Sequence, residues 1–169
     1  DVTGENIIFE MSSSEKMRID SSGRVLIGTN SSRQTRSGAN LFPPDIQLES
    51  DSVAAMSLTR FADTTAPARF ILQKGRGTGA SPTVVQDGDL AGQIIFSAWD
   101  GDTFTNTAQI RSEVDGTPGD DDMPGNLIFS TTPDGSSVRQ ESLRITSVGK
   151  VGIGTDNPQK ILHALSSEN

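Results

Sequence analysis

The chain has 169 residues, of which only 33% are hydrophobic and 5% aromatic, and its formal net charge is −8. Ordinary globular domains have an apolar share of about 45–50%. A chain this polar has difficulty burying enough surface to offset the conformational entropy that folding costs. Because its few apolar residues are regularly spaced, we expect association with other chains, not disorder, to complete its core.

The acidic balance excludes several classes of partner. A nucleic-acid binder needs a basic stripe to meet phosphate, so we expect no nucleic acid partner and no anionic membrane surface. No apolar run approaches the ~18–20 residues of a membrane span, and we expect no membrane insertion. Cysteine is absent, which excludes disulfides, thiolate metal sites and a cysteine nucleophile. The chain opens without a signal-peptide pattern or an initiator Met, and we expect it to be a piece of a longer protein.

A repeat organises the sequence. Residues 15–29 (EKMRIDSSGRVLIGT) and 141–155 (ESLRITSVGKVGIGT) are identical at nine of fifteen positions, and residues 6–9 match residues 126–129 farther upstream. Period-2 alternation bounded by Ser, Gly and Asp predicts three short strands per copy, in the first copy at 7–11, 16–20 and 24–28. So few strands are marginal alone in water, and such a module needs neighbours.

Between the copies the pattern predicts a larger β domain. Short alternating or apolar stretches separated by Gly- and Asp-rich turns are typical of strands. We expect these strands near residues 46–48, 56–58, 69–73, 93–97 and 110–114. The predicted organisation is a β repeat module at 1–29, a linker at 30–42, a central β domain at 43–125, a second module at 126–157 and a C-terminal extension at 158–169. The extension could hold one helical turn or a last strand.

The motifs MRIDSSGRVLIGT and LRITSVGKVGIGTDNP resemble the M-R-I-D-x-x-G-x-V-G-I-G-T-x-x-P repeat of phage tail-fibre proteins of the marine and cyanobacterial type. Those proteins often carry an intramolecular chaperone domain after the repeat. The resemblance extends through the middle of the chain, and this sequence departs from the pattern at Leu26, where Gly is usual, and at Thr146 and Val148. It implies a homotrimeric fibre located in the virion, and thus extracellular, that contacts other tail proteins and binds a host-surface glycan or protein, or spaces the element that binds.

The candidate sites are few. Trp99, Asp100 and Asp102 could contact a ligand, because aromatic rings stack on sugars and anchor interfaces, although packing is the commoner role. Asp-Gly turns such as 87–89 and 115–122 could hold Ca²⁺, but their spacing fits no established loop and turn formation explains them better. His163 could form a three-histidine metal site only on a three-fold axis. We expect no cofactor, no metal and no catalysis.

The fold that we predict is all-β: an intertwined homotrimeric fibre in which short-strand repeat modules flank a β-sandwich-like domain. Its function would be structural, as part of a phage tail fibre that contributes to host attachment. A polysaccharide-degrading tailspike and a bacterial surface adhesin or secreted fibre are the alternatives. The apolar stripes of the modules should point to the shared axis; the candidate trimer-core residues are Ile7, Phe9, Met17, Ile19, Val25, Ile27, Phe129, Leu143, Ile145, Val151 and Ile153.

Overall fold

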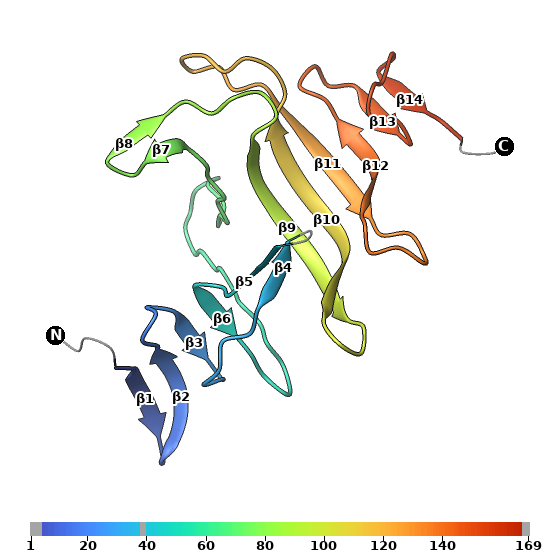
Figure 1. The fold of residues 1–169 in the computed structure, drawn as a ribbon. Helices are drawn as coiled ribbons and strands as arrows, with labels where there is room; N and C mark the ends of the chain where they lie inside the picture. Colours follow the sequence, from blue (N-terminus) through green and yellow to red (C-terminus); the bar gives the residue numbers. More distant parts are fainter. Residues whose placement is uncertain (1–4, 38–39, 167–169) are drawn as a thin grey trace. The chain divides into compact units, whose positions relative to one another are not determined.

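The structure is a computed structural model that describes residues 5–37 and 40–166. All regular secondary structure in these residues is β, which confirms the all-β prediction (Figure 1). No helix in the described part of the chain could cross a membrane. The chain divides into two units, residues 1–70 and 71–169, which are taken in turn.

The first unit contains a four-stranded sheet. Its strands are β1 (Ile7–Met11), β2 (Ser14–Ile19), β3 (Val25–Ile27) and β6 (Ile46–Leu48), in that spatial order. Ser12 and Ser13 join β1 to β2 with φ values of 52° and 61°. Two consecutive positive φ values are what a tight type I′ turn requires, so this short connection closes an antiparallel hairpin. A separate hairpin of β4 (Thr35–Ser37) and β5 (Asn40–Phe42) lies within the stretch predicted as a linker.

The second unit contains a six-stranded sheet. Its spatial order is β14-β13-β12-β11-β10-β9. These strands are β9 (Leu90–Trp99), β10 (Phe104–Val114), β11 (Gly125–Thr131), β12 (Gln140–Ile145), β13 (Val151–Ile153) and β14 (Leu162–Ala164). A further hairpin, β7 (Arg76–Thr78) with β8 (Ser81–Thr83), precedes the sheet in the chain. Leu162–Ala164 is therefore a last strand, which decides between the two alternatives for the extension.

Both units contain the same four-strand module. In the first, β1, β2 and β3 form an antiparallel meander and β6 then pairs parallel to β3. In the second, β11, β12 and β13 form the meander and β14 pairs parallel to β13. The backbone bonds correspond: Val25 N donates to Asp45 O at 2.8 Å, and Val151 N donates to Ile161 O at 2.7 Å. The repeat in the sequence is thus a structural repeat, with a fourth strand that sequence similarity did not reveal.

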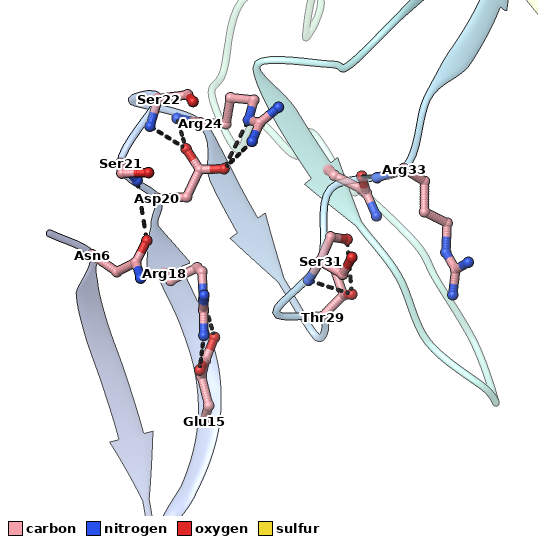
Figure 2. A network of polar contacts seen from close by, with 11 residues as sticks. Asn6, Glu15, Arg18, Asp20, Ser21, Ser22, Arg24, Thr29, Ser31 and Arg33 are labelled. Carbon is pink, nitrogen blue, oxygen red and sulfur yellow. Dashed lines mark hydrogen bonds and ion pairs between the residues drawn. The ribbon is translucent and has the colours of Figure 1, made fainter. Parts of the chain in front are cut away.

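The turn between the second and third strands of the module is held by a side chain. In the first copy the Asp20 carboxylate accepts from Ser22 N at 2.9 Å and Arg24 N at 3.1 Å, as Figure 2 shows. In the second copy Thr146 Oγ1 accepts from Lys150 N at 3.1 Å. The turn requires a side-chain oxygen that accepts from its backbone N–H groups, and both the Asp20 carboxylate and the Thr146 hydroxyl supply one.

The middle of the chain differs from the predicted sandwich. β6 belongs to the first sheet, and β9 and β10 extend the second sheet, so among the described strands the central region forms no sandwich of its own. The boundary between the two units also falls inside this region, after Phe70. The predicted strands at 56–58 and 69–73 are wrong for the single chain, because residues 49–75 contain neither strand nor helix.

Candidate functional site

Alternation of side chains gives each module one apolar face. Residues that are paired across neighbouring strands share a face of a sheet. In the first module the register pairs Phe9 with Met17, Met17 with Ile27, and Ile27 with Leu48. In the second it pairs Phe129 with Leu143, and Leu143 with Ile153. The eleven candidate trimer-core residues therefore lie on the apolar faces of the two modules, as the alternation predicted.

The apolar face of the second unit continues beyond the module. Ile110 of β10 pairs with Phe129 on one side and with Ile94 of β9 on the other. Phe96 of β9 lies on the same face and is 50% exposed. The apolar surface therefore spans the six-stranded sheet from its β14 end to its β9 edge.

Most of this apolar surface is not covered within the single chain. None of the eleven candidates is buried, and five of them, including Ile7 and Ile153, expose between 36% and 51% of their surface. The buried apolar side chains among the described residues are Leu26, Val85, Val114 and Ile128. Each unit thus has an exposed apolar face, and the described residues form almost no core of their own.

The total accessible area leads to the same conclusion. The chain exposes 12559 Å². A folded monomer of 17.9 kDa exposes roughly 8,000 Å² by the usual scaling of area with mass. Even two separate folded bodies of half that mass would together expose only about 9,700 Å². The excess of several thousand Å² is comparable to the ~2,000–5,000 Å² that obligate interfaces bury.

The opposite face of each module carries a bidentate ion pair. Arg18 donates from Nε and Nη2 to the two carboxylate oxygens of Glu15, each at 2.6 Å, as Figure 2 shows. Arg144 makes the same pair with Glu141 at 2.6 and 2.7 Å. Hydrogen bonding to the partner lowers the pKa of Glu15 and raises the pKa of Arg144 above its ordinary value. The two faces of each module therefore differ: one is apolar and exposed, and the other carries the ion pair beside buried Leu26 or Ile128.

The three ligand-binding candidates lie together at the β9–β10 turn. The rings of Trp99 and Phe104 pack edge to face with centroids 5.3 Å apart, and both side chains stay largely exposed. The Asp100 carboxylate accepts from the backbone N–H groups of Asp102 and Thr103 and from the Thr105 hydroxyl. These bonds, with that from Thr103 the strongest, lower the pKa of Asp100 to about 2. Asp100 therefore builds the turn, and an exposed aromatic pair is the feature left for contact with a ligand.

The acidic turns are engaged in structural contacts. Asp89 pairs with Arg76 at 2.6 Å and with Lys74 at 3.3 Å, and the bond from Arg76 holds the Asp89 pKa well below its ordinary value. Asp87 accepts from Gly116 N at 2.8 Å, and Asp115 accepts from Ser147 N at 3.0 Å. Within residues 5–37 and 40–166, no group of three His, Cys, Asp or Glu side chains is placed to hold a metal ion. His163 Nδ1 accepts from Gln159 N at 3.2 Å.

Comparison with known proteins concerns the fold. No protein-family model and no curated protein matches the chain. Among solved structures, the carboxy-terminal domain of the L-shaped tail fibre of bacteriophage T5 is similar, with a TM-score of 0.61 and 16% sequence identity. The likeness is in the fold. It covers 89% of this chain and 64% of the tail-fibre domain, so this chain corresponds to less than two thirds of that relative.

Proposed function

We propose that this protein is a structural segment of a phage tail fibre that works as a homotrimer, contributes to attachment to the host surface and catalyses no reaction. The observation that carries the proposal is the uncovered apolar face in a chain with the fold of a tail-fibre domain. Three copies that turn this face to a common axis would bury it and leave the face with the Arg18–Glu15 pair in water. Closed three-fold symmetry ends the association at three chains, because every copy of the face is then buried.

The oligomeric state tests the assembly. Light scattering on a size-exclusion column should give three times the chain mass of 17.9 kDa. A folded monomer at micromolar concentration would contradict the trimer and, with it, the proposed fibre.

Its role in the virion requires a second experiment. Mass spectrometry of purified phage particles should find peptides of this chain in the tail fraction. The purified trimer should also compete with those particles for adsorption to host cells. If the trimer released reducing sugars from host polysaccharide, the protein would be a tailspike enzyme instead. Absence of the chain from the particles would favour an adhesin or a secreted fibre.

A further inference from the structure

Residues 53–74 form a segment whose backbone pairs with no other strand among the described residues. No backbone hydrogen bond joins them to another described residue. Their large apolar side chains are exposed, from 45% at Leu72 to 94% at Phe61. Residues 57–60 and 67–69 line an open groove of about 510 Å³ between two arms of this segment. Apolar side chains exposed at this density indicate a surface that another chain covers.

The first arm has the composition of a strand. Residues 54–60 (AAMSLTR) contain no Gly and no Pro, and Met56 and Leu58 alternate with Ser57 and Thr59. Such alternation suits a strand with one apolar and one polar face. The second arm, 67–73, begins with Pro67 and shows no alternation, which makes it the weaker strand.

The six-stranded sheet has an edge strand, β9, that is unpaired on its outer side among the described residues, and its exposed apolar side chains could continue the apolar side of residues 54–60. β9 is ten residues long and is the outermost strand, with β10 as its sheet neighbour on one side. Ile94 and Phe96 on its apolar face are 45% and 50% exposed. A long, exposed, apolar edge strand is a template for pairing with another chain, and proteins seldom leave one uncovered.

We propose that residues 54–60 of one copy add to the β9 edge of a neighbouring copy as a further strand, with Met56 and Leu58 extending its apolar face. The inference rests on the proposed trimer and specifies how its chains are intertwined. A second copy is the occupant because the excess accessible area calls for a partner, and because the new strand would continue the face proposed to pack on the axis. Main-chain hydrogen bonds would supply affinity, and the alternation of side chains would set the register.

The residues of the same chain that lie near β9 do not pair with its edge. Leu72 lies against the face of the sheet, where a Cβ placed on Gly92 would come within 2.7 Å of the Leu72 Cβ. Lys74 and Arg76 form ion pairs with Asp89, the residue just before β9. These contacts bring residues 72–76 over the start of the strand and not along its edge.

Disulfide trapping tests the pairing directly, because the natural chain has no cysteine. Cross-strand neighbours have Cβ atoms about 4.5–5.5 Å apart, close enough for a disulfide with slight adjustment. Four double variants combine Met56→Cys or Leu58→Cys with Ile94→Cys or Phe96→Cys. At least one should give covalent dimers and trimers on a denaturing gel without reductant, in several-fold higher yield than the matching single variants. The control pair, Val138→Cys with Phe96→Cys, uses a loop residue of similar exposure and should stay below that yield.

Hydrogen exchange on the unaltered trimer provides a second test that needs no variant. Paired amides of residues 54–60 should exchange at least about 100-fold more slowly than unstructured ones. Two results would contradict the strand pairing between copies but not the trimer. One is a trimer in which the amide hydrogens of residues 54–60 exchange as fast as unstructured ones. The other is disulfides that form only within single chains. A monomer in solution would instead contradict the proposed function from which the inference starts.

Discussion

Leu26 and Gly152 occupy the same position in the two copies of the module, and the chain that passes over them decides which residue fits. In the first copy Leu26 pairs with Arg18 and is 1% exposed. In the second copy a Cβ on Gly152 would lie 2.4 Å from the carbonyl oxygen of Thr155, in the connection that leads to β14. The corresponding connection of the first copy is longer, from 28 to 45, and contains the β4–β5 hairpin. The departure from the repeat motif at Leu26 thus has a structural reason.

Gly152→Ala should therefore destabilise the second unit. The added methyl group meets backbone, which cannot move aside as a flexible side chain can, and overpacking of this kind typically costs about 1–3 kcal/mol. The measurement is the thermal unfolding midpoint at fixed protein concentration. Gly75→Ala is the control, because an added Cβ there has nothing within 4 Å, and its midpoint should stay near that of the natural chain. Equal midpoints for the two variants would contradict the close approach.

Gly28→Ala should cost more than Gly23→Ala. Both glycines have positive φ, 77° and 80°, so an alanine at either position bears the same backbone strain of about 1–2 kcal/mol. At Gly28 alone the Cβ would also meet the carbonyl oxygen of Glu49, 2.1 Å away, beyond the end of β6. The difference between the two denaturation free energies isolates this clash. If Gly23→Ala were as damaging as Gly28→Ala, strain alone would explain both.

Ile19→Asp and Ile145→Asp should each dissociate or misfold the trimer. In the proposed assembly these side chains pack in axial layers, where an aspartate would have no partner for its charge. Light scattering should then give the mass of one chain, or the protein should be unfolded. Val148→Asp makes the same change of type in a turn where the side chain is 74% exposed, and it should remain trimeric. Trimers of unchanged heat resistance from both axial variants would show that the apolar face does not pack on the trimer axis.

The Asp100 turn should make the stability of the protein fall at low pH. The folded pKa of Asp100 is about 2, below its ordinary value of 3.8, so the carboxylate contributes stability above pH 3.8 that is lost as the pH falls toward 2. Asp100→Asn should lower the unfolding midpoint at pH 7, and the difference from the natural chain should shrink as the pH is lowered from about 4 toward 2. Asp102→Asn is the control, because that side chain makes no hydrogen bond to the described residues, and it should have little effect at either pH. A difference for Asp100→Asn that is constant with pH would show that the charge is not the cause.

Much of the fold follows from local patterns in the sequence. The strand at Ile7–Met11, the alternation of Met17 with Ile19, and the glycine turns after Asp20 and Thr146 are set by side-chain periodicity and backbone conformation. These depend on residues near one another in the chain, so they can be predicted from the sequence. The same alternation placed the eleven candidate trimer-core residues on their faces.

The tertiary structure decided what depends on distant residues. Parallel pairing of β6 with β3 joins residues on either side of a long connection, and no local pattern marks Ile46–Leu48 as its partner strand. Apolar stretches at 56–58 and 69–73 have the pattern of strands, yet a strand needs a backbone partner, and the single chain supplies none among its described residues. Periodicity shows which side chains seek burial, whereas only long-range pairing shows whether one chain can bury them.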